Sequence, residues 1–139
     1  MRLNLISLAC AALLAAGLSF GVGAGPIVDS DSDGIIDELD NCSNIANVDQ
    51  FDADVDGYGS ICDGDFDDDF IVFGTDYSSL AAAFGSNSPP AAKELDMDND
   101  GLIFGTDFSA FAQQFGGPPG PSGLDCAGNV GACAGISPP

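Results

Sequence analysis

The stretch DSDSDGIIDELD, residues 29–40, carries aspartate at its first, third, fifth and twelfth positions and glycine at its sixth. Its twelve residues include six carboxylates. Two such charges 4 Å apart repel by about 1 kcal/mol in water, and by more in a drier setting. A compact structure for this stretch therefore requires a positive partner that the sequence itself does not supply.

The same aspartate spacing occurs four times, in residues 29–40, 52–63, 65–76 and 96–107. With 20 aspartates among 139 residues, chance would produce only about 0.05 such matches. The spacing is therefore a repeat and not a by-product of acidity. The aspartates that satisfy it are Asp29, Asp31, Asp33, Asp40; Asp52, Asp54, Asp56, Asp63; Asp65, Asp67, Asp69, Asp76; Asp96, Asp98, Asp100 and Asp107.

This spacing matches a twelve-residue calcium loop, in which side chains at the first, third, fifth and twelfth positions and the seventh backbone carbonyl supply oxygen ligands. The sixth position is glycine because the chain turns sharply there. Asp37 is a further candidate ligand at the ninth position of the first loop, where the second loop has Ser60. The residues whose seventh-position carbonyls are expected to face the ion are Ile35, Tyr58, Ile71 and Leu102.

The third loop departs from the rule, because Phe70 stands where the others have Gly34, Gly57 and Gly101. A left-handed backbone costs a residue with a side chain about 1–2 kcal/mol. Phe70 must either adopt that conformation or bend the loop away from the usual path. We expect the third loop to be the weakest of the four sites.

Calcium is favoured over other cations by the chemistry of the ligands. Magnesium is the competing ion, but flexible cages of several carboxylates and a carbonyl suit calcium better than a cation that demands octahedral geometry. The chain has no histidine and no cysteine at ligand spacing, which argues against zinc. The alternative without metal is a disordered acidic spacer, since many charges and few apolar groups do not offset chain entropy.

The first 24 residues have the charged, apolar and small-residue order of a secretory signal peptide, with cleavage expected after Ala24. A lipid anchor at Cys10 is the rival interpretation. Cleavage leaves Lys93 as the one basic side chain against 22 acidic ones, a formal charge of −21. Such a charge excludes nucleic acids and anionic membrane surfaces as direct partners.

Four cysteines remain after cleavage, and an even number in a secreted chain with a small core indicates two disulfides. Of the three possible connectivities, chain order favours Cys42 with Cys62 and Cys126 with Cys133. The residue types present also limit catalysis, because a chain with no histidine and one lysine cannot build most pairs of nucleophile and base. We therefore expect no enzyme activity.

Residues 65–85 and 96–116 are copies of one another, identical at 11 of 21 positions. Behind each loop, apolar residues recur at helical spacing. Thr75 and Thr106 are expected to cap the helices, and Gly85 and Gly116 to end them. The apolar faces, which we expect to pack together, consist of Tyr77, Leu80, Ala81 and Phe84 in the first copy and of Phe108, Phe111, Ala112 and Phe115 in the second.

This duplicated half, residues 63–117, resembles the dockerin type I module, which consists of two calcium loops each followed by a helix. The resemblance implies docking onto a cohesin module through residues near the loop ends. Those places hold Gly74-Thr75 and Gly105-Thr106, which only partly match the Ser/Thr pairs of cellulosomal dockerins. From the residues themselves, β-branched Val72 and Ile103 are expected to pair the two loops by a short strand contact.

Residues 29–65 resemble a thrombospondin type 3 repeat. The resemblance rests on the aspartate ladder, Asp40-Asn41-Cys42, Asn47, Asp49-Gln50 and Cys62-Asp63. It implies little regular structure, with the chain wrapped around calcium ions and held by a disulfide. Ser43 stands where the family usually has proline, and Ser60 where it usually has aspartate, which removes one ligand.

The expected fold is thus a small calcium-stabilised protein: an irregular, disulfide-linked half that wraps calcium, followed by an all-α pair of EF-hand-like loop-helix motifs. Its expected segments are a signal peptide (1–24), the thrombospondin-like repeat (25–64), the dockerin-like module (65–117) and a Pro/Gly-rich tail with a small disulfide loop (118–139). The predicted function is that of a secreted calcium-binding structural or adhesion protein. The alternatives are an adaptor for a cohesin-like receptor and an extracellular calcium buffer.

Overall fold

The fold is known from a computed structural model, which describes residues 26–129, 131 and 133–134. The expected signal peptide and the alternative anchor at Cys10 lie outside the described residues. Within them, no helix is long and apolar enough to cross a membrane. The helical elements are η1 (Asp37–Leu39), η2 (Ser60–Cys62), α1 (Gly74–Ala83), η3 (Lys93–Leu95) and α2 (Gly105–Gln114).

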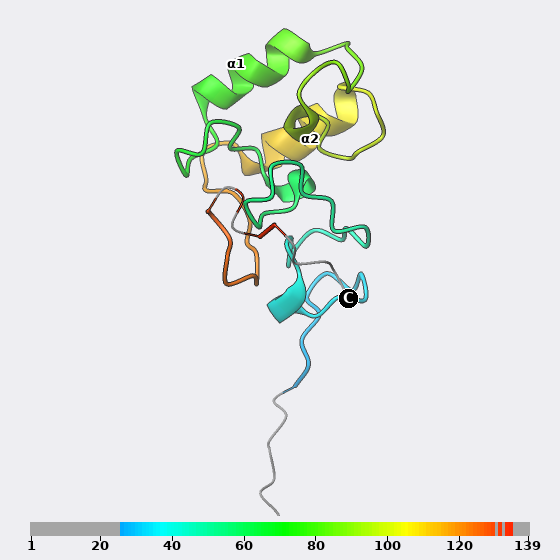
Figure 1. The fold of residues 1–139 in the computed structure, drawn as a ribbon, viewed down its shortest axis with the longest axis vertical. Helices are drawn as coiled ribbons and strands as arrows, with labels where there is room; N and C mark the ends of the chain where they lie inside the picture. Colours follow the sequence, from blue (N-terminus) through cyan, green and yellow to red (C-terminus); the bar gives the residue numbers. More distant parts are fainter. Residues whose placement is uncertain (1–25, 130, 132, 135–139) are drawn as a thin grey trace, which may run out of the picture.

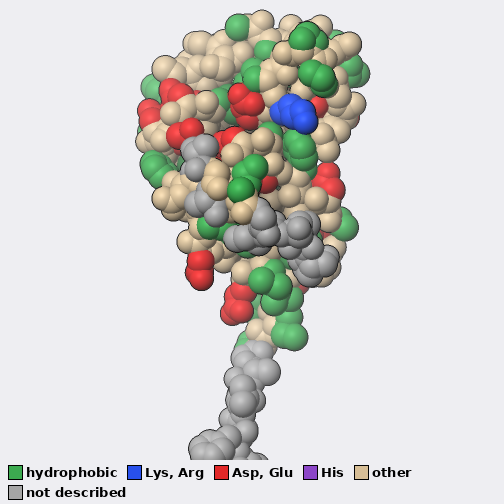
Figure 2. Space-filling view, in the orientation of Figure 1, with side chains coloured by type: hydrophobic (Ala, Val, Ile, Leu, Met, Phe, Trp, Pro, Cys, Tyr) green, Lys and Arg blue, Asp and Glu red, His purple; other side chains and the backbone are tan. Residues whose placement is uncertain are grey.

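The molecule has an irregular first half and a second half built on α1 and α2 (Figure 1). In the described part of the chain, the one β-contact is an isolated antiparallel bridge between Asn87 and Leu102. The expected combination of an irregular half with two helices, in a protein with little strand, is confirmed. Figure 2 shows how acidic the surface is, with one blue group, Lys93, among the red carboxylates.

Each helix begins differently from the sequence prediction. The N-cap residues are Phe73 and Phe104, while Thr75 and Thr106 lie exposed in the first turn. The orphan amide of Phe73 donates to Asp76 Oδ2 at 2.8 Å, and the equivalent Phe104 amide donates to Asp107 at the same distance. The threonine caps were therefore a wrong prediction, because the last aspartate of each loop already supplies the acceptor.

The helix ends agree with the sequence. Gly85 and Gly116 follow the C-cap residues and have φ of 86° and 90°, in the left-handed region that glycine adopts without steric cost. The third loop also resolves as one of the two expected alternatives, since Phe70 has a φ of 67°. The chain therefore keeps the usual loop path and accepts the strained residue.

The core lies between the two copies. Phe111 is its largest fully buried side chain and packs near Phe66 and Tyr77, with ring centroids 5.9 and 6.4 Å away. Tyr77 and Phe111 thus meet as predicted, but the two apolar faces do not pack along their length. Of their eight residues only Leu80 and Phe111 are buried, and Tyr77 and Phe115 keep 47% and 49% of their surface exposed. The buried cluster comprises Val72, Leu80, Leu95, Met97, Ile103, Ala110 and Phe111.

Val72 and Ile103 do not pair with each other, so the expected strand contact between the loops was wrong. Val72 pairs with the segment after α2: its amide donates to Gly117 O, and its carbonyl accepts from Gly116, both at 2.8 Å. Ile103 pairs in the same way with Gly85 and Ser86, just after α1, at 2.8 and 2.9 Å. Each copy therefore completes the backbone hydrogen bonds of the other, and this crossed pairing buries both side chains fully.

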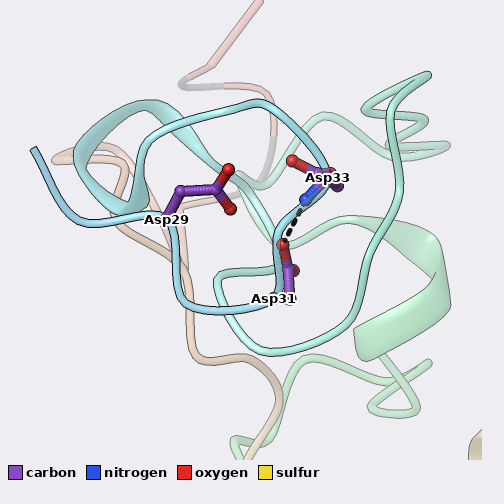
Figure 3. A group of neighbouring side chains, drawn as sticks. All are labelled: Asp29, Asp31 and Asp33. Atoms are coloured by element: carbon purple, nitrogen blue, oxygen red, sulfur yellow. Dashed lines mark hydrogen bonds between the residues drawn. The ribbon is translucent and has the colours of Figure 1, made fainter.

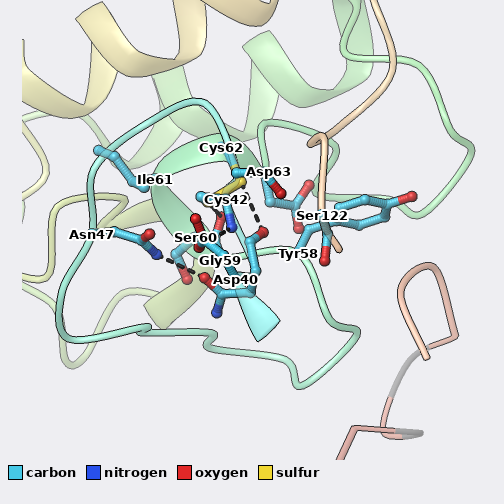
Figure 4. The surroundings of a disulfide bond; sticks show 12 residues. Asp40, Cys42, Asn47, Tyr58, Gly59, Ser60, Ile61, Cys62, Asp63 and Ser122 are labelled. Carbon is cyan, nitrogen blue, oxygen red and sulfur yellow. Dashed lines mark hydrogen bonds between the residues drawn. A yellow bond between two sulfur atoms is a disulfide. The ribbon is translucent and has the colours of Figure 1, made fainter. Parts of the chain in front are cut away.

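Both expected disulfides are present, Cys42–Cys62 and Cys126–Cys133. The first is buried in the irregular half beside Gly59, which approaches Cys42 so closely that a Cβ there would meet its sulfur at 2.7 Å (Figure 4). The two halves are joined by Gln114 of α2, whose side chain accepts from Gly64 N at 2.9 Å and donates to Ile61 O at 3.1 Å. The halves are therefore held in one arrangement.

Candidate metal centre

All four acidic loops have the same backbone shape. The sixth residue of each has a positive φ, between 67° at Phe70 and 99° at Gly34. The fourth residue of each also has a positive φ, which the sequence rule did not predict. These fourth residues are Ser32, Val55, Asp68 and Asn99, with φ of 67°, 66°, 58° and 54°. Two left-handed residues flanking the fifth position bend the chain around a common centre.

The first aspartate of each loop holds this bend. In the first loop, Asp29 accepts from Ser32 N at 2.7 Å and from Gly34 N at 3.1 Å. In the fourth loop, Asp96 accepts from Asp100 N at 3.1 Å and Gly101 N at 3.0 Å. Asp52 and Asp65 act in the same way in the second and third loops. Short aspartate side chains favour such turns by accepting from nearby amides.

The fifth and ninth positions also fasten the loops. The fifth-position carboxylates accept from the seventh-position amides: Asp33 from Ile35, Asp56 from Tyr58, Asp69 from Ile71 and Asp100 from Leu102. At the ninth position, both oxygens of Asp37 accept from Ser30, at 2.7 and 2.8 Å. Ser60 substitutes for that aspartate in the second loop by accepting from Ala53 N at 3.1 Å. Ser60 thus keeps the loop contact although it lacks the carboxylate.

In each loop, three carboxylates converge to within 4.8 Å of one another. Figure 3 shows the first of these clusters, with Asp29, Asp31 and Asp33 on one turn of the chain. The loops differ in which positions meet: first, third and fifth in the irregular half, and first, third and twelfth in the helical half. The clusters are Asp29, Asp31, Asp33; Asp52, Asp54, Asp56; Asp65, Asp67, Asp76; and Asp96, Asp98, Asp107.

Three of the four twelfth-position aspartates are fully buried. Asp76 and Asp107 are fully buried and cap their helices, and each also accepts from the second residue of its own loop, Phe66 or Met97. Asp40, the last residue of the first loop, is also fully buried, with Oδ1 accepting from Gln50 Nε2 at 2.7 Å. Asp63 accepts from Asp65 N at 3.1 Å, which links the second and third loops.

These residues fit a hard divalent cation. Among the buried side-chain oxygens of the described residues, Asp31 Oδ2 and Asp40 Oδ2 have no hydrogen-bond partner. A buried carboxylate oxygen without a donor is costly unless it faces a positive charge. The remaining candidate ligands are also oxygens, the donor type that calcium selects. In the third and fourth loops, Asp69 and Asp100 lie exposed outside the convergent groups.

Burial and the crowding of carboxylates raise the pKa values of several aspartates. Burial, reinforced by Asp56, raises the pKa of Asp63 to about 9. Burial, with Asp54 and Asp52 nearby, raises the pKa of Asp56 to about 6. Burial likewise raises the pKa of Asp31, and the charges of Asp33, Asp40 and Asp29 add to that effect. Without a cation, the folded loops therefore favour protons on carboxyl groups that are ionised in water at pH 7.

Calcium binding should therefore release protons. An unfolded aspartate has a pKa near 3.9. The raised pKa of Asp63 therefore stabilises the metal-free fold fully below about pH 3.9, and this stabilisation is lost as the pH rises towards about 9. A cation favours the ionised form, so binding at pH 7 should release about one proton from Asp63. Calorimetry in two buffers of different ionisation enthalpy measures this number. Asp63→Asn should abolish most of the release; equal heats in both buffers for the parent protein would contradict the expectation.

A buried amide network connects the first loop to the rest of the irregular half. Asn41 N donates to Gln50 Oε1 at 2.9 Å, and Asn47 Nδ2 donates to Asn41 Oδ1 at 2.7 Å. The same network reaches two candidate ligands, because Gln50 donates to Asp40 and Asn47 N donates to Asp33 Oδ2. The spacing of the acidic residues does not predict this supporting role. The sequence feature that indicates it is the group of asparagine and glutamine residues between the first and second acidic loops.

Residues 28–50 match the family model of the thrombospondin type 3 repeat. This match spans the first acidic loop, its twelfth aspartate Asp40 and all three members of the amide network. Thrombospondin type 3 repeats are calcium-binding modules of extracellular proteins, which is consistent with the oxygen-only clusters. The match ends before residue 63, so the dockerin-like interpretation of residues 63–117 stays a prediction. No curated protein and no solved structure matches the chain.

Proposed function

We propose that this chain is a secreted, non-enzymatic calcium-binding protein that serves a structural or adhesive role and whose fold depends on ions held in its four acidic loops. The observation that carries the proposal is the convergence of three carboxylates in every loop, on a backbone bent alike in all four. Lys93 is the one basic side chain of the described residues, so protein cations cannot neutralise these clusters. The match of residues 28–50 to a calcium-binding extracellular repeat supports the same conclusion.

Bound calcium would supply much of the stabilisation that a hydrophobic core provides in other proteins. Four ions would reduce the formal charge of −21 on the cleaved chain to −13. Extracellular calcium modules bind at about 10⁻⁴ to 10⁻³ M, so at a few times Kd each site contributes about 1 kcal/mol by mass action. Sites of this strength stabilise the fold only together, with the disulfide and the small core assisting them.

The test is a calcium titration of the cleaved, oxidised protein, monitored by calorimetry and by circular dichroism. We expect three or four ions to bind in the micromolar to millimolar range, with the third loop weakest because of Phe70. The helical signal should rise as they bind, since Asp76 and Asp107 join the clusters to the helix starts. Chelation should reverse the change.

Single asparagine variants at the third position assign the ions to loops. Asp31→Asn, Asp54→Asn, Asp67→Asn and Asp98→Asn should each remove or weaken one ion and leave the other three. Magnesium at equal concentration serves as the ion control, and exposed Asp49→Asn as the charge control, because Asp49 lies outside all four clusters. If about 10 mM calcium, well above the expected range, produced neither heat nor helix, the acidic loops would be a spacer without metal.

A second candidate, docking onto a cohesin-like receptor, is favoured by one surface of the helical half. An open apolar groove there is lined by Tyr77, Leu80, Ala81, Phe84 and Phe108. The residues near the loop ends, Gly74-Thr75 and Gly105-Thr106, are exposed as docking requires. A pull-down with a cohesin module in calcium, compared with the same experiment in chelator, decides between the adaptor and a self-contained structural protein.

A further inference from the structure

The segment after α2 turns back onto the irregular half. Residues 120–128, called the strap below, run in orange beside the first half in Figure 1. Gly120 N donates to Cys62 O at 2.9 Å, and Gly123 N donates to Asp40 O at 2.8 Å. Pro121 O accepts from Ser43 N at 3.0 Å. The strap is therefore tied to the backbone on both sides of the first disulfide.

Beyond these ties, the strap reaches the second acidic loop. Ser122 Oγ donates to Gly57 O at 2.6 Å, and Gly128 N donates to Asp56 O at 2.9 Å. Just past the strap, Cys133 N donates to Val55 O at 3.4 Å. Three consecutive carbonyls of the loop, at its fourth, fifth and sixth positions, thus accept from the C-terminal segment.

The packing leaves no gap between the strap and this loop. A Cβ at Gly57 would lie 2.7 Å from Ala127 Cα and 2.6 Å from Cys133 Sγ. On the strap side, a Cβ at Gly120 would lie 2.8 Å from the ring of Tyr58, the seventh residue of the loop. Glycines at both contact points allow the two backbones to approach.

The second loop contains a residue whose conformation requires support. Its left-handed fourth residue is Val55, with φ of 66°, whereas the other loops have serine, aspartate or asparagine there. Aspartate and asparagine adopt this conformation several times more often than a β-branched residue, for which it is an outlier. A strained residue persists only where its surroundings hold it. The strap contacts the two residues that follow Val55, and Cys133, just past the strap, contacts Val55 itself.

We propose that the strap is a positioning segment for the second loop. By holding Asp56 and Gly57, directly after the strained Val55, it keeps the conformation that gathers Asp52, Asp54 and Asp56 for a cation. The inference rests on the proposed calcium function. The affinity of this loop should depend on the strap. The third loop, which the strap meets through Gly128 beside Phe70, receives none of these hydrogen bonds and should depend on the strap less.

Two tyrosines allow the loops to be read separately. Tyr58 belongs to the second loop, and Tyr77 directly follows Asp76, the last residue of the third. Terbium, which substitutes for calcium, luminesces when a nearby tyrosine absorbs light. Tyr77→Phe therefore leaves a reporter of the second loop and Tyr58→Phe a reporter of the third.

The strap is altered in two ways within each reporter background. Ser122→Ala removes the hydroxyl that bonds Gly57 O, and Gly123→Ala places a Cβ against Asp37 O. We expect Ser122→Ala to weaken terbium binding at the second loop about 3- to 10-fold, the worth of one hydrogen bond, and Gly123→Ala to weaken it more. Binding at the third loop should change less than about twofold, because these contacts do not touch it. Gly105→Ala, whose Cβ meets nothing within 4 Å, is the matched control.

Hydrogen exchange of residues 52–63 in chelator provides a readout without metal, and both strap variants should accelerate it. Unchanged second-loop affinity in both variants would overturn the proposal, and so would an equal loss at both reporters, which would make the strap a general support of the fold. Failure of terbium and calcium to bind the parent protein at all would instead refute the calcium function itself.

Discussion

Asp107→Ala should destabilise the protein by roughly 2 to 6 kcal/mol in excess calcium, one of the two largest effects we expect. Its carboxylate accepts from Met97 N and Phe104 N, each at 2.8 Å, and is fully buried. Alanine would leave the buried Met97 amide and the partly buried Phe104 amide without an acceptor, at about 1–3 kcal/mol for each, with the Phe104 amide towards the lower end. It would also remove one of three converging carboxylates from the fourth loop. Urea unfolding followed by circular dichroism measures the loss.

Asp98→Ala is the matched control, because Asp98 belongs to the same cluster. Its one backbone contact, with Asp100 N, is longer, at 3.2 Å, and lies at the exposed side of the loop. Both variants should lose calcium from the fourth loop, but Asp107→Ala should lose several kcal/mol more of the free energy of unfolding. Equal destabilisation by the two substitutions would show that Asp107 contributes only as a ligand and not as the cap of α2.

Removing the disulfide between Cys42 and Cys62 should lower the free energy of unfolding by about 3 kcal/mol. The bridge links residues 20 apart, and closing a loop of that length in the unfolded chain has about this value in the chain-entropy treatment. The double variant Cys42→Ala, Cys62→Ala avoids free thiols at these buried positions. Urea unfolding in excess calcium measures the change.

The effect should concentrate in the irregular half. Cys42 directly follows Asp40-Asn41, and Cys62 directly precedes Asp63, so the bridge joins the ends of the first two loops. Terbium binding read through Tyr58 should weaken in the double variant, while binding read through Tyr77 should persist. A change in unfolding free energy below about 0.5 kcal/mol would place the bridge outside the stabilising contacts.

The sequence predicted the local features of this protein well. Aspartate spacing located the four loops because the spacing directly determines which carboxylates can converge. Apolar spacing located α1 and α2. The left-handed Phe70 is one of the two alternatives that the demand of the sixth position for a positive φ left open. Chain order favoured the disulfide pairing that the structure contains.

The error in the helix caps came where one residue has two roles. Thr75 and Thr106 had the right chemistry for helix caps but lie inside the first turn, and Asp76 and Asp107 were considered only as ligands. A carboxylate that closes a loop also lies within reach of the first amides of the helix behind it. Reading the loop and the helix as one motif would have predicted the cap.

Contacts distant in sequence were not predictable from patterns. The strap carries glycine and proline without apolar periodicity, and its contacts depend on close backbone approach at Gly57 and Gly120. The roles of Asn47 and Gln50 likewise depend on which buried amides face each other across the irregular half. Neither periodicity nor residue spacing encodes such pairings.

The crossed pairing of Val72 and Ile103 sets how this module can grow. Each copy forms backbone hydrogen bonds to the segment that follows the other copy's helix. The two copies therefore form a single cooperative unit. A third tandem copy would find both pairing positions already taken and would have no partner for its own β-branched residue. Lengthening by gene duplication would therefore have to proceed two copies at a time.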